Sequence, residues 1–183
     1  MKRLFELSEY PANGRLATYE KELIKLLKSK DKDGIITFSK KVFEDCVKYL
    51  KTSFDFQIPN LYLNLMNHKD YTKLCDDLDL LLGKRPKTLA ILVGDYSGNP
   101  PTVYVDFEKT FSFFKKTGKP INFLINLIAS YLEELVHSND TSKSEIEIHD
   151  ILCDVFEGFT EVKLTKEVKE HRLNYARKIE KTK

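Results

Sequence analysis

The stretch PINFLINLIASYLEELVH, residues 120–137, decides how this chain folds. Its apolar residues recur at helical spacing, and at about 100° per residue they gather on one side. They are Leu124, Ile125, Ile128, Tyr131, Leu132 and Leu135. A narrow polar stripe lies roughly opposite and consists of Asn126, Ser130, Glu133 and His137. Because Phe123 and Leu127 flank this stripe, we expect a long helix whose polar side chains line a cavity or a partly solvated edge.

Both helices and strands are expected on either side of this segment. Apolar spacing predicts helices over 16–30, 38–52, 70–82, 107–116, 144–159 and 165–179, and strands over 58–66, 88–94 and 102–107. Turn residues at 95–101 (DYSGNPP) predict a hairpin between the last two strands. Ser142 followed by Glu145 predicts a capping box before the penultimate helix. The expected fold class is therefore α+β: a small, mostly antiparallel sheet with a hairpin, covered by several helices.

Length and composition favour one soluble domain. The chain has 183 residues, 42% hydrophobic and 32% charged, with a formal net charge of +2. That balance argues against disorder and against a protein that coats nucleic acid. Only 7 Gly and 6 Pro argue against an all-β fold. We expect a single domain over 1–183, made of a helical half with one strand (1–87), the hairpin and motif helices (88–160) and a charged C-terminal helix (161–183).

The cysteines and apolar segments indicate a cytoplasmic protein without a membrane span. Cys46, Cys75 and Cys153 are odd in number and widely spaced, so no disulfide framework or zinc ribbon is expected. The first fifteen residues contain no apolar run resembling a signal peptide. The longest apolar stretch, 120–136, is interrupted by polar residues and predicts a buried helix rather than a membrane span.

Two pairs of side chains suggest a metal site. Glu133 and His137 lie one helical turn apart, so both can bind one ion, and Glu134 beside them can orient a metal-bound water. In the next expected helix, Glu145 and His149 are also four apart and border its apolar face. A short connection between the helices predicts that the two pairs approach each other.

The segment LEELVHS, residues 132–138, resembles the active-site helix of zincin metallopeptidases. That family carries His-Glu-x-x-His, and the matching residues here are Glu133-Glu134-Leu135-Val136-His137. The resemblance covers roughly 88–159 and implies zinc as cofactor. It implies Glu134 as general base and Glu133, His137 and one of Glu145 or His149 as metal ligands. The chain departs from the family at Glu133, where the first His is expected, and it has no standard third-ligand motif.

The resemblance predicts a zinc-dependent peptidase acting on a peptide or protein, with the strand 102–106 as the edge that aligns the substrate. One alternative is a catalytically inactive zincin-like scaffold that binds protein partners. A less favoured one is a small nucleic-acid-associated protein that uses the basic stretch 163–183, which otherwise forms a charged exposed helix. His137 can also lie simply at a solvated helix end, and His149 can be a structural histidine.

Overall fold

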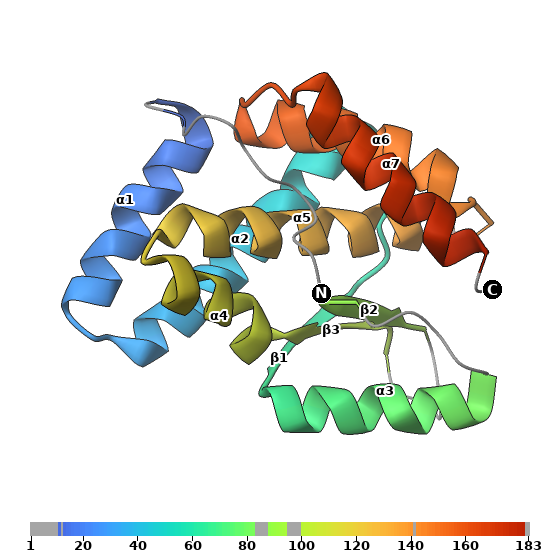
Figure 1. Ribbon diagram of the computed structural model, residues 1–183, viewed down its shortest axis with the longest axis horizontal. Helices are drawn as coiled ribbons and strands as arrows, with labels where there is room; N and C mark the ends of the chain where they lie inside the picture. The colour runs from blue at the N-terminus through green and yellow to red at the C-terminus, as the bar shows by residue number, and fades with distance from the viewer. Residues whose placement is uncertain (1–10, 12, 83–87, 95–99, 141, 182–183) are drawn as a thin grey trace.

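The computed structural model describes residues 11, 13–82, 88–94, 100–140 and 142–181 (Figure 1). Its elements follow the order α1 (Gly14–Lys28), α2 (Lys32–Ser53), β1 (Tyr62–Met66), α3 (His68–Leu82), β2 (Ala90–Val93), β3 (Thr102–Asp106), α4 (Phe107–Thr117), α5 (Pro120–Asn139), α6 (Glu145–Thr160) and α7 (Lys166–Glu180). Each predicted helix and strand is present, so the α+β class is confirmed. Residues 95–99 of the expected hairpin turn 95–101 lie outside the described residues.

Helix α5 is the centre of the molecule. It begins with Pro120 at its first turn, where a missing N–H costs nothing, and every residue from Ile121 to Val136 is buried. Figure 1 shows it crossing the middle of the fold between the α6–α7 pair and the sheet. Helices α1, α2, α4 and α6 and strand β2 all pack against it. A single hydrophobic cluster therefore joins both halves of the chain around one helix.

The sheet has the order β1-β3-β2. The pair β2–β3 is antiparallel, as a hairpin requires, but β1 runs parallel to β3. Parallel neighbours need a crossover connection, and α3 lies in the connection that leaves β1. The expectation that strand 102–106 is a sheet edge is wrong, because β3 is the central strand and its hydrogen-bonding groups are directed to β1 and β2.

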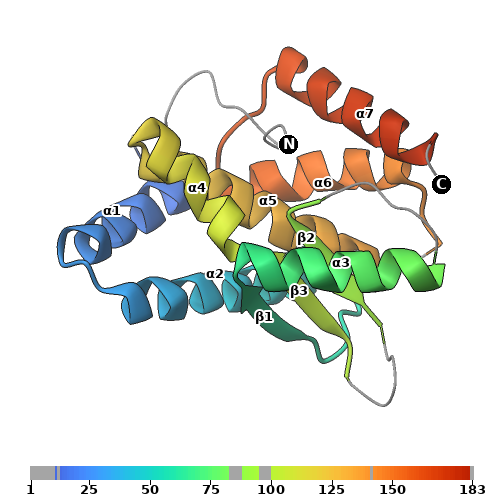
Figure 2. The ribbon, with the colours of Figure 1, turned by 60° about the horizontal axis from the view of Figure 1, so that its bottom comes forward.

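The two faces of the sheet are covered by different helices. Register places Leu63 beside Val103 and Leu65 beside Val105, on the face that joins the core around α5. Helix α3 packs on β3 from the opposite side, as Figures 1 and 2 both show. This arrangement leaves β1 and β2 as the two margins of the sheet.

Local capping moves two helix starts away from the predicted positions. The turn residue Asp31 caps α2 by accepting a hydrogen bond from Gly34 N at 2.8 Å, so α2 begins six residues before the predicted Phe38. The capping box of α6 consists of Ser144 and Glu147, not Ser142 and Glu145. Glu145 therefore takes no part in the capping box of α6.

The cysteines differ in burial: Cys46 and Cys153 are buried, whereas Cys75 is partly exposed. None of the helices in the described part of the chain is long and apolar enough to cross a membrane.

Burial of α5 predicts a large difference between two isoleucines in helices. Ile128 on α5 is fully buried, whereas Ile36 on α2 is 37% exposed. Ile128→Ala leaves a cavity and should lower the free energy of unfolding by about 2–5 kcal/mol. Ile36→Ala should cost less than about 1 kcal/mol. Urea denaturation of both variants measures this, and equal losses would show that α5 is not the centre of the core.

Candidate functional site

The polar stripe of α5 is enclosed by protein. Asn126, Ser130 and Glu133 are 0%, 1% and 7% exposed, and His137 at the end of the stripe is partly exposed. This confirms that the stripe does not face open solvent. Four of the predicted site residues, Glu133, Glu134, His137 and Glu145, meet here with a residue that the sequence analysis missed, Arg172. We call these five residues the ionic cluster.

Glu133 is held by Arg172 of α7. The Arg172 Nη2 donates to Glu133 Oε1, and the arginine is completely buried. The Cζ atom of Arg172 also lies 5.1 Å from the centre of the Tyr175 ring, which gives a cation–π contact. Within the described residues, Nε and Nη1 of Arg172 have no hydrogen-bond partner. The ion pair with Glu133 is therefore the main compensation for burying this cation.

The C-terminal helix was expected to be a charged, exposed helix, and that is wrong for one face. Ala176 and Ile179 are buried and Val168 is half-buried on this face, at helical spacing from Arg172. The sequence contained an indication that Arg172 is buried, because this residue lies on the apolar stripe of the helix, at a position where an apolar core residue is normally found.

Glu134 closes the outer margin of β2. Its Oε2 accepts a hydrogen bond from Leu92 N at 2.7 Å, so the carboxylate satisfies a backbone donor that faces away from β3. Burial raises the pKa of Glu134 to about 7, while the charge of His137 opposes this rise. Glu134 therefore changes protonation near neutral pH, which fits the expected general base as well as a structural role.

The predicted approach of the two helices is confirmed for Glu145. His137 Nε2 lies 3.8 Å from Glu145 Oε2, and both side chains are mostly buried. Burial alone would lower the pKa of His137, but the hydrogen bond with Glu145 and the charge of Glu134 raise it overall. The pair therefore favours an imidazolium facing a carboxylate.

His149 makes different contacts. Its ring nitrogens lie 3.8 Å from Cys153 Sγ, and its Nε2 lies 3.8 Å from Asp150 Oδ1. Burial, with the charge of Arg172 next, lowers its pKa, so the imidazole is neutral near pH 7. These contacts fit the structural histidine better than the metal ligand, and Glu145 rather than His149 is the residue that reaches His137.

The ionic cluster does not fit a divalent cation in this arrangement. No group of three His, Cys, Asp or Glu side chains in the described ranges is placed to hold a metal ion. The guanidinium of Arg172 already neutralises Glu133, and a second cation there would be repelled by it. Glu134 is also engaged, through Leu92 N. The cluster instead balances three carboxylates with an arginine and a histidine.

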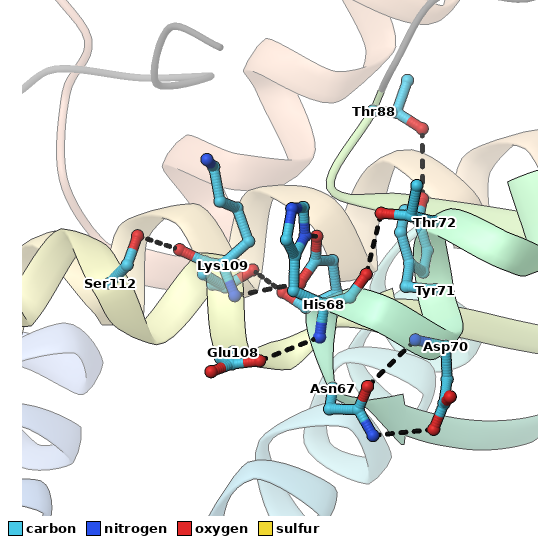
Figure 3. A network of polar contacts seen from close by, with 11 residues as sticks. Asn67, His68, Asp70, Tyr71, Thr72, Thr88, Glu108, Lys109 and Ser112 are labelled. Atoms are coloured by element: carbon cyan, nitrogen blue, oxygen red, sulfur yellow. Dashed lines mark hydrogen bonds and ion pairs between the residues drawn. The ribbon is translucent and has the colours of Figure 1, made fainter.

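A second polar network joins α3 to α4 (Figure 3). The His68 side chain is 55% exposed, and its Nδ1 lies 2.6 Å from Asp106 Oδ2. Asp106 is buried and caps α4 by accepting from Lys109 N, while Glu108 accepts from His68 N. Asn67 accepts from Asp70 N at the start of α3. These bonds satisfy helix ends, and they give the network a structural role.

Breaking the buried ion pair from one side should be costly. Arg172→Met leaves the Glu133 carboxylate buried without a partner and should lower the free energy of unfolding by about 3–5 kcal/mol. The double variant Glu133→Leu/Arg172→Met removes both charges and should recover most of this loss. Arg177→Met, on the exposed face of α7, is the matched control and should change stability by less than about 0.5 kcal/mol. A loss below about 1 kcal/mol for Arg172→Met would contradict the assigned pair.

The ionic cluster also predicts pH-dependent stability. Folding raises the pKa of Glu134 from 4.5 to about 7 and raises that of His137 above 6.5, so these two groups bind more protons in the folded state, whereas the lowered pKa of His149 acts in the opposite direction. Because the Glu134 shift is the largest of the three, we expect stability to fall as pH rises, by about 1–3 kcal/mol between pH 5 and 8. Glu134→Gln, which keeps an acceptor for Leu92 N, should flatten the curve, whereas Glu170→Gln on exposed α7 should not. Urea midpoints at both pH values test this, and stability that rises with pH would overturn it.

Comparisons of this chain with protein-family models, with curated proteins and with solved structures found no match. What the ionic cluster does is therefore inferred from its own geometry.

Proposed function

We propose that this chain is a zincin-like scaffold that lacks peptidase activity and binds a protein partner. The observation that carries the proposal is the buried pair between Arg172 and Glu133. Glu133 stands at the first-ligand position of the motif that the segment 132–138 resembles. A fixed guanidinium at this carboxylate supplies the positive charge that a metal would otherwise supply.

The surroundings of Glu134 also favour a binding role. Glu134 Oε2 accepts a hydrogen bond from Leu92 N at 2.7 Å, so one of its two carboxylate oxygens already has a structural partner and is less available to hold a water molecule. The same bond uses an outward N–H of β2, and β3 is paired on both sides. Among the described residues, an extended substrate therefore cannot pair with β3, and at the margin of β2 the outward N–H of Leu92 is already used.

A zinc peptidase is the second candidate, and one contact supports it. His137 and Glu145 approach to 3.8 Å, which is the separation expected of two ligands of one zinc ion. In that case Glu133, His137 and Glu145 would hold zinc after Arg172 moved away, and Glu134 would act as general base. The extra carboxylate would make such a zinc a weaker activator of water than a zinc bound by neutral histidines.

The cysteines favour a reducing compartment for this scaffold. Cys46, Cys75 and Cys153 are all free cysteines, whereas proteins of oxidising compartments commonly pair such residues in disulfides. We therefore place the protein in the cytoplasm.

Metal content separates the two candidates. The purified chain, dialysed with one equivalent of zinc, should retain well below one zinc per chain by elemental analysis and should cleave no peptide in a fluorogenic library. Glu133→His/Arg172→Met restores the two-histidine motif and removes the cation, so this variant should gain zinc binding.

Two controls make the result decisive. His137→Ala in the Glu133→His/Arg172→Met background should abolish the gained zinc, because it removes one of three protein ligands. If the natural chain instead holds one zinc, loses it on His137→Ala and keeps it on Glu134→Gln, the metal-free scaffold is excluded and the peptidase stands.

A further inference from the structure

A surface groove lies on the other side of the fold, away from the ionic cluster. It has a volume of about 590 Å³ and runs between the second half of α2 and the start of β1. Its walls include Glu44, Val47, Lys48 and Lys51 of α2 and, on the other side, Leu61 and Tyr62. Tyr62 is 60% exposed, so a large aromatic side chain remains available at the rim. Such a groove accepts a chain segment rather than a small enclosed molecule.

Strand β1 begins at this groove, with Tyr62 in the lining, and one of its margins has no strand neighbour among the described residues. Tyr62 N donates to Pro101 O at 3.0 Å, which directs the backbone of Tyr62 toward β3. In a parallel pair the direction alternates, so Asn64 and Met66 also face β3, while the N–H and C=O groups of Leu63 and Leu65 face outward. Among the described residues β1 has β3 as its one strand neighbour. An added strand could therefore take four hydrogen-bonding groups.

The charged side chains that line the groove indicate which kind of peptide segment can bind in it. Lys48 and Lys51 lie one turn apart on the exposed wall of α2. No described residue forms an ion pair with either lysine. Glu44 is the one acidic side chain in the groove lining. The groove combines these cations with the apolar surfaces of Val47 and Leu61. An extended segment lying in it would place alternate side chains over α2, where acidic groups would meet the lysines.

We infer that this groove binds an extended, acidic segment of a partner protein, which adds to β1 as a further strand of the sheet. The inference rests on the proposed binding function and names its site and the chemistry of its partner. Backbone bonds to Leu63 and Leu65 supply affinity, and the lysines select acidic side chains at alternate positions. The site is separate from the ionic cluster, so the two can be tested independently.

A displayed library of random twelve-residue peptides provides the probe. Selection on the full chain should enrich peptides with Asp or Glu at alternate positions and without Pro between them. A synthetic copy of an enriched peptide should bind the natural chain, and Lys48→Glu/Lys51→Glu should weaken binding by tenfold or more. Lys32→Glu/Lys40→Glu, which makes the same charge change on α2 outside the groove, should leave affinity within about twofold.

Hydrogen exchange gives a readout specific to strand addition. The bound peptide should slow exchange of the Leu63 and Leu65 amides at least tenfold, because their N–H groups become hydrogen-bonded. A copy of the peptide with N-methylated alternate residues should lose both affinity and protection. Tyr62→Thr keeps strand propensity but removes the aromatic rim and should weaken binding several-fold.

Each contrary result overturns the inference. No acidic enrichment, unchanged affinity for Lys48→Glu/Lys51→Glu, or protection that avoids β1 would each exclude the assigned groove. Concentration-dependent dimerisation abolished by Tyr62→Thr would assign the margin of β1 to a second copy of this chain instead. If acidic peptides bind as expected but the chain also holds zinc and cleaves peptides, the proposed function fails while the groove remains.

Discussion

The buried ion pair between Glu133 and Arg172 is the interaction on which the arrangement of the C-terminal helices depends. It joins the most buried helix, α5, to the most charged one, α7, across 39 positions of sequence. Arg172 has no exposed surface, so in the natural chain α7 docks with a buried cation that faces the carboxylate of Glu133. Replacing both residues by apolar ones need not destabilise such a fold, whereas removing one leaves an uncompensated charge. The pair therefore specifies how α7 docks more than it adds to the stability of the fold.

This pair also reduces the charge repulsion within an acidic cluster inside the molecule. Glu133, Glu134 and Glu145 lie within one small region, and three buried carboxylates would repel one another. Each carboxylate has a different partner. Glu133 pairs with the guanidinium of Arg172, Glu134 accepts from a backbone N–H and is partly protonated near neutral pH, and Glu145 faces the imidazole of His137. A catalytic zinc site would need Glu133 and His137 as metal ligands and Glu134 as general base. The contacts that balance charge in the cluster therefore occupy the same side chains that catalysis would require.

Local patterns in the sequence predicted the elements well, because helix and strand periodicities are properties of short segments. The spacing of residues 120–137 identified α5 and its enclosed polar stripe, and the positions of Glu145 and His149 on the border of the α6 core face were correct. The central position of β3 could not be predicted, since strand order depends on which distant segments pair. Only the structure showed that Glu145 rather than His149 turns to His137.

The role of Arg172 was missed for a related reason. A charged residue in a charged helix is usually solvated, and its burial depends on a partner 39 positions away. The capping box of α6 was predicted at Ser142 and Glu145, and this was wrong because Ser144 also precedes an acidic residue at the same spacing. Helix and strand periodicity were therefore accessible from the sequence, whereas the choice between equivalent caps and the contacts between elements were not.

Anomalous diffraction at the zinc edge, from crystals of the natural chain grown with zinc, tests the central claim most directly. The account predicts density for the Arg172 guanidinium against Glu133 and no anomalous peak between His137 and Glu145. A peak bound by Glu133, His137 and Glu145, with Arg172 displaced from the carboxylate, would contradict it.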